Sequence, residues 1–550
     1  NWPSKSQAPI YDFKVLTQME MLFKRYRFEH DVYTDDELTE LTNRKFLDIQ
    51  EEIAAGYTKV PKVSTFLVVQ RARKLVKQVL GPYDRQVHMS MCRFAKRASQ
   101  GNKARESYID NKLHGPVTGS EDQIRWFKDY LASDNLLRMI VGDEFVTSDL
   151  LYQTNVPKSF KILRGINPNT TIGSFYTSGL GKYIEICLRR GTKIDLRFQP
   201  EKHGFWARKG SRSRKIVTAD LSHASHNFTI PLLNRLLPRD WYNACKLGAI
   251  RRVDLDGRIY ALESIMTMGI GFTFPLQTLL FYSIIKSIGD LLGVVGVYSV
   301  FGDDLIYPRQ IHPYVRACFE DLGFTINRDK TFVDDYFRES CGQDFYHGVD
   351  VRPFQPEGSY RRLHKMRYAA FLYQMLNGLL KRWNRVEINQ TFRFVISEIL
   401  RVQSCVYQVP LDYPDYSGVQ TATYESFDME VPWITPKYDH TQSLRIQCLD
   451  MLRSRRVVEH MDAYLWDSLR NSEQSTQCGD DPDWVMEGNK LVPSTESIVW
   501  ITAENQPRNY RSKITGKRLF LKVPTVGEKL PANVRFVVSD RSRIRNRRPK

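Results

Sequence analysis

Apolar residues recur at helical spacing through most of the first 140 residues. The segment STFLVVQRARKLVKQVLG at 64–81 shows this pattern: a Lys/Arg face runs beside the apolar positions, Ser64 or Thr65 can cap the start, and Gly81 can end it. The same spacing returns at 361–383 and at 441–470. The pattern predicts a basic helical region before the middle of the chain and a mostly helical one after it.

Between residues 215 and 350 the pattern changes to short β-branched runs separated by helical ones. KIVTADLS at 215–222 and VVGVYSVFGDDLIYP at 294–308 predict strands. FPLQTLLFYSIIKSIGDLL at 274–292 predicts a helix with Pro275 in its first turn. The fold class predicted from this mixture is α+β.

The last part of the chain adds two weaker signals. Apolar runs at 496–502, 518–523 and 534–540 predict a small β element. Residues 541–550 carry six basic side chains and predict a flexible tail.

Composition then narrows the class of partner. The chain has 550 residues, of which 42% are hydrophobic, so it can bury a large core. A formal charge of +18 favours a polyanionic partner, with nucleic acid as the first candidate. The eight cysteines show no metal-ligand spacing, and no apolar run is long enough to predict a membrane span.

The clearest chemistry lies in the triplet Gly302-Asp303-Asp304. It separates two apolar runs and therefore sits at the tip of a predicted β-hairpin, where Gly302 allows the turn. Asp220 ends another predicted strand. If the strands are neighbours, the carboxylates form a pocket that is costly without a divalent cation, so two Mg²⁺ ions are predicted, with Mn²⁺ as a substitute.

Two stretches rich in small residues are predicted as loops that suit phosphate contacts. They are GINPNTTIGSFYTSGLG at 165–181 and FWARKGSRSRK at 205–215, where aromatic and basic residues interleave. A solvated surface loop is the alternative. In MGIGFTF, Gly269 and Gly271 leave the backbone bare for approach by a nucleic-acid strand, and Thr273 can cap the next helix.

The order of DLSHAS, MGIGFTF, FGDD, GFTINRDKTF and FRESCG, followed by GVDVRPF, closely resembles the RNA-dependent RNA polymerases of single-stranded RNA bacteriophages, the leviviruses. The resemblance is strongest over 150–355. It implies a right-hand fold with an antiparallel palm sheet and largely helical fingers and thumb. The implied domains are fingers at 1–214, a palm at 215–352 into which fingers elements can interleave, a thumb at 353–540 and the basic tail.

The resemblance also implies roles for single residues. Asp220 and Asp303 match the metal-binding aspartates, Asp304 their supporting partner, and Lys330 the lysine that protonates the pyrophosphate. The candidates for binding the nucleoside triphosphate are Lys158, Lys161 and Arg164 of the basic motif within 156–165, together with His226, Asn227, Gly269, Gly271 and Thr273. The candidates for RNA binding are Arg338, Glu339 and Ser340 of FRESCG, together with Arg208, Lys209 and Arg212.

Two positions depart from the family pattern at places associated with ribose recognition. His226 stands where relatives usually carry an aspartate, and Ile270 stands where they carry an asparagine. We favour a rearranged sugar contact in which His226 and Asn227 supply hydrogen bonds. The alternative is that His226 packs beside the helix that follows.

The predicted reaction is RNA-templated attack of an RNA 3′-hydroxyl on the α-phosphate of a nucleoside triphosphate. The resemblance further implies initiation without a primer, host elongation factors Tu and Ts and a ribosomal small-subunit protein as partners, no membrane, and action in the cytoplasm of an infected bacterium. Two alternatives stay open. They are a reverse transcriptase and an RNA-binding protein that keeps the fold without catalysis.

Overall fold

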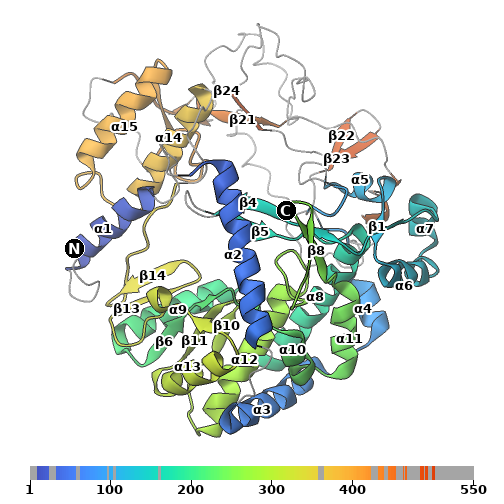
Figure 1. Cartoon of the computed structure of the whole chain (residues 1–550). Helices are drawn as coiled ribbons and strands as arrows, with labels where there is room; N and C mark the ends of the chain where they lie inside the picture. Colours follow the sequence, from blue (N-terminus) through green and yellow to red (C-terminus); the bar gives the residue numbers. More distant parts are fainter. Residues whose placement is uncertain are drawn as a thin grey trace, which may run out of the picture. The chain divides into compact units, whose positions relative to one another are not determined.

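Figure 1 draws the computed structural model with colours that follow the sequence. The chain divides into two compact units. Unit 1 comprises residues 1–17, 30–352 and 460–474, and unit 2 comprises 18–29, 353–459 and 475–550. The structure describes residues 9–23, 33–56, 62–95, 98–102, 107–158, 163–356, 365–422, 431–438, 444–453, 462–463, 465–467, 484–487, 490–493 and 498–501.

The predicted helical region at the start of the chain is confirmed. Its helices are α1 (Ile10–Phe23), α2 (Asp35–Gly56), α3 (Val63–Leu80), α4 (Arg85–Met91), α5 (Ile109–His114), α6 (Glu121–Leu131) and α7 (Asn135–Val141). Helix α3 ends at Gly81 as predicted, with φ 67°, but the predicted cap is wrong. Lys62 holds the N-cap position without a side-chain bond, because Ser64 and Thr65 already lie inside the helix.

Short strands connect this region to the rest of unit 1. They are β1 (Thr118–Gly119), β2 (Val146–Thr147), β3 (Leu151–Tyr152), β4 (Thr154–Pro157), β5 (Leu163–Ile166), β8 (Arg252–Leu255) and β9 (Arg258–Ala261). Strands β4 and β5 form an antiparallel hairpin in which Val156 faces Arg164.

Both predicted loops are mostly helical. Helix α8 (Thr171–Thr192) begins where the Thr170 hydroxyl accepts a hydrogen bond from the amide of Gly173 at 3.0 Å. Its glycines serve close packing: a methyl group on Gly181 would lie 2.5 Å from the Gly271 carbonyl oxygen. Helix α9 (Gln199–Ser213) has proline in its first turn and buries His203, Gly204, Ala207, Gly210 and Ser211. Gly204, Ala207 and Gly210 recur every three positions, and their small side chains bring the helix close to the sheet it covers.

A three-stranded antiparallel sheet, in the order β10–β11–β6, lies at the centre of the sequence-predicted α+β region (Figure 1). Its strands are β6 (Ile216–Ala219), β10 (Ser299–Phe301) and β11 (Asp304–Pro308). We call it the central sheet. Helix α9 contacts all three strands, and α12 (Thr273–Leu291) contacts β10.

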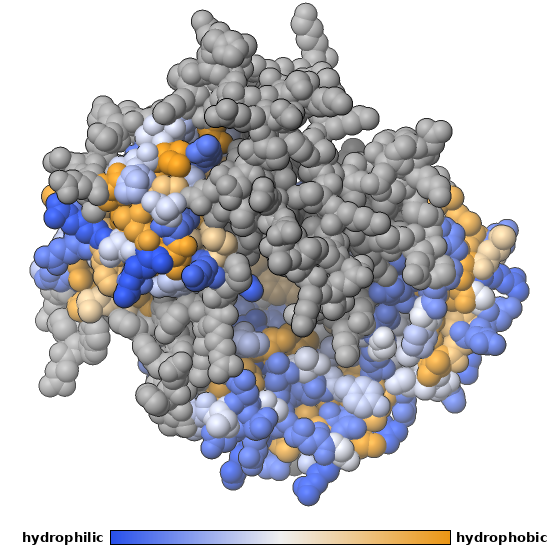
Figure 2. Space-filling view, turned by 90° about the horizontal axis from the view of Figure 1, so that it is seen from above, coloured by the Kyte–Doolittle hydropathy of each residue, from blue (hydrophilic) through white to orange (hydrophobic). Residues whose placement is uncertain are grey.

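Helix α12 is apolar on nearly every side, which is typical of a helix buried all round. Leu276, Leu279, Phe281 and Ile284 are fully buried, and the helix packs against α3 and α8. Other elements of unit 1 are β7 (Leu221–Ser222), α10 (Ile230–Leu236), α11 (Arg239–Gly248), α13 (His312–Asp321), β12 (Thr325–Ile326), β13 (Phe337–Ser340), β14 (Gln343–Tyr346) and β15 (Val349–Asp350). In Figure 2 hydrophilic side chains predominate over the described surface and are broken by smaller apolar patches.

Unit 2 is built on α14 (Lys365–Leu380) and α15 (Asn389–Val402), which pack against each other and against β16 (Val406–Pro410) and β17 (Val419–Thr421). The helix predicted over 441–470 is wrong in its first part, which carries β20 (Leu444–Arg445) and β21 (Asp450–Arg453). Strand β21 pairs with β24 (Ile498–Ile501), which confirms one of the late strands. The remaining short strands are β18 (Trp433–Ile434), β19 (Lys437–Tyr438), β22 (Trp484–Glu487) and β23 (Lys490–Pro493).

Several predicted features lie outside the described residues. These are the late strands at 518–523 and 534–540 and the basic tail at 541–550. Within the described part of the chain, no helix has the length and apolar character needed to cross a membrane.

Candidate active site

The central sheet places Asp220 beside the Gly302-Asp303-Asp304 turn. In β10 and β11, Phe301 faces Asp304, so Gly302 and Asp303 form the predicted two-residue turn. In β11 and β6, Leu305 faces Ala219, and the next position along β6 is Asp220. The antiparallel register therefore brings all three carboxylates to one end of the sheet, as the sequence predicted.

Local packing fixes the shape of this turn. Gly302 has φ 64°, a left-handed conformation that favours glycine, and a methyl group on it would lie 2.4 Å from the Phe274 ring. Its amide donates to the Thr278 hydroxyl of α12 at 2.9 Å. Helix α12 thus holds the turn that presents Asp303.

The carboxylates at this end of the sheet disfavour one another's charge. Burial, followed by the charge of Asp220, raises the pKa of Asp303. Burial and the charges of Glu339, Asp303 and Asp220 raise the pKa of Asp304 to about 7, although the Cys341 amide donates to its carboxylate at 3.3 Å. This arrangement is costly when all the acids are ionised and would be relieved by a cation.

Lys330 contacts the same cluster. It follows Asn327 in a short 3₁₀ turn (Arg328–Lys330), and its ammonium lies 3.2 Å from a carboxylate oxygen of Asp220. Burial opposes its charge, but the charge and hydrogen bond of Asp220 outweigh that effect and raise the pKa of Lys330. Lys330 is therefore protonated at neutral pH.

Asn327 is a site residue that the sequence reasoning missed. Its side-chain amide donates to Asp220 at 3.2 Å, and its backbone amide donates to the Asp220 carbonyl at 2.9 Å. Its place two residues before the Asp-Lys pair of NRDKTF was the only sequence signal. The contact shows that β12 and the turn after it position Asp220 from one side.

Two of the three predicted triphosphate-binding cations lie near the acids. Lys158 follows β4 and Arg164 lies in β5, while Lys161 lies outside the described residues. Burial, Arg164 and Lys330 lower the pKa of Lys158, whereas Asp220 and Asp303 act in the opposite direction. Lys158 is therefore close enough to two other cations, Arg164 and Lys330, and to the acids Asp220 and Asp303 for their charges to affect its own.

The donor set fits a hard divalent cation, since it consists of carboxylate oxygens whose mutual repulsion such an ion removes. In the described residues, however, no group of three or more Asp, Glu, His or Cys side chains is already gathered to hold a metal ion. The Asp220 carboxylate is engaged by Lys330 and Asn327. Both contacts are to the Oδ2 atom of Asp220, so a bound cation would share this carboxylate with the Lys330 ammonium.

The residues predicted to contact the sugar are mostly internal. His226 is 4% exposed, its ring meets Phe46 edge-on at 5.6 Å, and burial lowers its pKa to about 4. The contacts favour the packing alternative, although the partner is α2 and not the helix that follows. Asn227 is half-buried.

The two glycines of MGIGFTF approach the protein's own backbone. A methyl group on Gly269 would lie 2.3 Å from the Asn167 carbonyl oxygen, and one on Gly271 would lie 2.7 Å from the Thr177 carbonyl. The prediction that they leave room for nucleic acid is corrected accordingly. Thr273 is also not a cap: it is the first residue of α12, is buried, and donates to the Thr267 carbonyl at 3.0 Å.

Two of the residues predicted to bind RNA through FRESCG are buried. Arg338 is fully buried, and its guanidinium donates to the carbonyls of Ile216 and Val333, at 2.7 Å each, and to those of Asp335 and Phe337. Burial lowers its pKa to about 10, so it remains charged. Ser340 is 1% exposed and is hydrogen-bonded to His203 at 2.8 Å. These two predictions are wrong, because both side chains hold β13 against β6 and α9.

The other RNA-binding candidates remain accessible. Glu339 is half-buried and accepts a hydrogen bond from the Gly342 amide at 3.2 Å. Arg208, Lys209 and Arg212 are exposed on α9, and Arg208 donates to the Gly348 carbonyl at 2.9 Å.

The chain is similar to known replicase subunits. A sequence model of the family described as RNA replicase, beta-chain, matches residues 16–481. An RNA-directed RNA polymerase beta chain of Enterobacteria phage GA is 29% identical over 337 residues, which are 59% of this chain and 63% of that one. The corresponding beta subunit of Enterobacteria phage SP is 37% identical over 234 residues, 42% and 39% of the two chains.

A third relative is the RNA-directed RNA polymerase subunit beta of Qbeta virus (strain MX1). It is 30% identical over 354 residues, 62% of this chain and 56% of that one. The chain thus spans about half the length of the relatives it matches. A solved RNA-dependent RNA polymerase of a human picorbirnavirus aligns with a TM-score of 0.43 at 14% identity, covering 72% of this chain and 83% of that one. A TM-score of this size does not support a fold assignment. The fold of this chain is therefore described from its own helices and strands.

Proposed function

Since this chain belongs to the family of RNA replicase beta chains, we propose that it synthesises RNA on an RNA template. The reaction is transfer of a nucleotide from a nucleoside triphosphate to an RNA 3′-hydroxyl, and it needs no primer. The observation that carries the proposal is the register of the central sheet, which gathers Asp220, Asp303 and Asp304 beside three cations.

Each group at this end of the sheet has a chemical part in that reaction. Asp220 and Asp303, supported by Asp304, hold two Mg²⁺ ions, which supply Lewis acidity to the attacking hydroxyl and the leaving pyrophosphate. Lys158 and Arg164 neutralise the triphosphate and fix its orientation. Lys330 is protonated, as a general acid must be, and exchanges its contact with Asp220 for one with the leaving pyrophosphate.

The architecture proposed with this function is a right hand. The central sheet belongs to a palm at 215–352, the helices before it to fingers at 1–214, and unit 2 to a thumb at 353–540. The chain acts in the cytoplasm of an infected bacterium, with elongation factors Tu and Ts and a ribosomal small-subunit protein as partners.

The test is RNA synthesis by the purified chain on a single-stranded RNA template with NTPs and Mg²⁺, or Mn²⁺ in its place, beside Asp303→Asn. We expect product from the wild type alone. Bacterial extract is added in a second arm, so that a missing host subunit is distinguished from an inactive chain. RNA binding without product in both arms would replace the proposal with an RNA-binding protein of polymerase fold.

His226 is buried, so it does not present its ring to the ribose of a nucleotide. The second readout is therefore the discrimination between ribose and deoxyribose. NTPs and dNTPs are offered in parallel on the same template. A preference for NTPs supports an RNA polymerase whose ribose contact is made by other groups, such as Asn227. Equal or better use of dNTPs would favour the reverse transcriptase alternative.

A further inference from the structure

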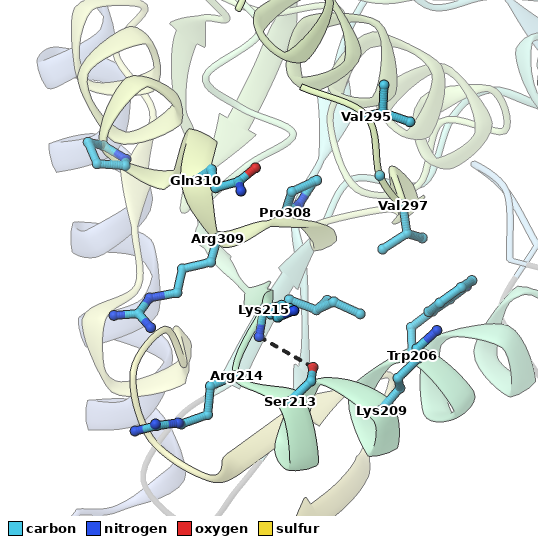
Figure 3. A pocket seen from close by; sticks show the side chains of 13 residues that line it. Trp206, Lys209, Ser213, Arg214, Lys215, Val295, Val297, Pro308, Arg309 and Gln310 are labelled. Carbon is cyan, nitrogen blue, oxygen red and sulfur yellow. Dashed lines mark hydrogen bonds between the residues drawn. The ribbon is translucent and has the colours of Figure 1, made fainter. Parts of the chain in front are cut away.

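A large basic pocket lies at the opposite end of the central sheet from the carboxylates. It has a volume of about 1060 Å³ and is lined by α9, the start of β6, the segment before β10 and the end of β11 (Figure 3). Strand β6 runs from Ile216, which lines the pocket, to Ala219, which precedes Asp220. Four residues of strand separate the two ends, roughly 13 Å.

The charged side chains of the lining are all positive. Among its 13 residues four are basic, namely Lys209, Arg214, Lys215 and Arg309, and none is acidic. Arg309 forms an ion pair with Asp334 outside the lining. Among the described residues, no carboxylate lies within ion-pair distance of Lys209, Arg214 or Lys215. Like charges gathered without counter-charges indicate a site for a polyanion.

Flat and apolar groups stand beside these cations. Trp206 lines the pocket, with the Lys209 ammonium 5.2 Å from its ring centre, and Phe205 next to it is 61% exposed. Val295, on the facing segment, is 98% exposed, and Val297 and Pro308 lie beside it (Figure 3). An aromatic ring beside Lys and Arg side chains suits single-stranded nucleic acid, in which bases stack and phosphates pair with cations.

The cations are distributed along the length of the pocket. In Figure 3, Trp206 and Lys209 come from α9 at one end, Arg214 and Arg309 extend to the same side at the other, and Lys215 lies between them. The left-handed backbone at Arg214, with φ 55°, ends α9 and directs the chain into β6. Basic residues that line the pocket from α9, from the turn after it and from just after β11 suit the several phosphates of a strand better than one isolated anion.

We propose that this pocket is a second binding site for single-stranded RNA, separate from the end that carries Asp220 and Asp303. A base stacks on Trp206, and the backbone phosphates pair with Lys209, Arg214 and Lys215. The site does not rest on catalysis, because a chain without polymerase activity keeps all of these groups. An acidic protein segment is the competing occupant; it would supply carboxylates to the cations but no row of flat bases to the Trp206 ring.

The first test measures binding of a fluorescein-labelled oligouridylate of about 12 nucleotides by fluorescence anisotropy, without NTPs, across a range of salt. In the triple variant K209A/R214A/K215A we expect affinity to fall at least about tenfold near 0.1 M salt, and the slope of log K against log salt to decrease by about 2. The matched control is R235A/R239A/K246A, which removes three exposed cations from α10 and α11.

The control variant should bind within about twofold of the wild type, with an unchanged salt slope. Equal losses in both triple variants, or no loss in either, would overturn the proposal. Circular dichroism and thermal melting of both variants verify that they fold.

The second test separates stacking from charge. Trp206→Ala should weaken oligouridylate binding about fivefold or more without changing the salt slope, while Trp206→Phe keeps most of the affinity. A 4-thiouridine probe should crosslink to residues 205–215 or 295–309. Crosslinks confined to the Asp220 and Asp303 end contradict the proposal. Tighter binding of oligoglutamate than of oligouridylate, lost in the basic triple variant, reassigns the pocket to an acidic protein.

Discussion

The two ends of the central sheet carry opposite charges. At one end, burial and the neighbouring acids raise the pKa of Asp303 and Asp304, and Lys330 pairs with Asp220. At the other, Lys209, Arg214 and Lys215 surround a pocket whose lining contains no acid. A bound cation would relieve the repulsion at the acidic end, and a bound polyanion would relieve it at the basic end. One small sheet thus carries an acidic surface at one end and a basic surface at the other.

The largest expected effect separates these ends directly. Asp303→Asn should reduce RNA synthesis by about 10³-fold or more, about 4 kcal/mol of barrier, because it removes a proposed metal ligand. The same variant should bind oligouridylate with unchanged affinity and salt slope. The measurement pairs single-nucleotide extension rates with anisotropy. If Asp303→Asn also lost RNA affinity by the amount expected of the basic triple variant, the two ends would not be independent.

The second largest effect is expected at Arg338, the buried arginine that donates to the carbonyl of Ile216 in the pocket lining. Arg338→Met should lower the free energy of unfolding by about 3 kcal/mol, since four carbonyl oxygens lose their charged donor. Arg208→Met, which removes an exposed arginine with one backbone contact, should cost under about 1 kcal/mol. Urea unfolding measures both. Equal costs would show that Arg338 is not the structural residue its contacts indicate.

A smaller effect should come from Lys330→Met. RNA synthesis should fall about 10²-fold, because the leaving pyrophosphate loses its proton donor. Metal affinity, measured by calorimetry without nucleotide, should rise, because the ammonium no longer competes for Asp220. Lys215→Met, at the basic end, should leave metal affinity unchanged. Weaker metal binding in Lys330→Met would contradict the exchange of contacts.

The smallest effect is a pH dependence of stability. His203 is buried against Ser340 between α9 and β13, and burial lowers its pKa to about 3. The unfolded chain takes up this proton near the ordinary pKa of 6.5, so stability falls as the pH drops below about 6.5, by up to about 1.4 kcal/mol per pH unit. His203→Asn should reduce this slope in urea unfolding at about pH 7, 6 and 5. An unchanged slope would show that other groups dominate it.

Much of the acidic end could be predicted from the sequence, because its signals are local. A two-residue turn with Gly302 between apolar runs predicts a hairpin, and a strand ending in Asp220 supplies the third carboxylate. The central α12 was predictable for the same reason, since its nearly continuous apolar run demands burial. The predicted loop at 205–215 was wrong because the buried face of α9 consists of small residues, which leave no apolar period to recognise.

Residue types and their order along the chain determined the α+β class, the positive charge, the hairpin and the candidate metal ligands. Only the tertiary structure decided which polar side chains face solvent. Three polar residues that could serve as exposed contact residues are buried: Arg338, Ser340 and His226. Each contacts a residue far away in the sequence, namely Ile216, His203 and Phe46 respectively. Burial depends on contacts between distant segments, which no local pattern encodes. For the same reason the basic pocket became visible only when α9, β6 and β11 were brought together.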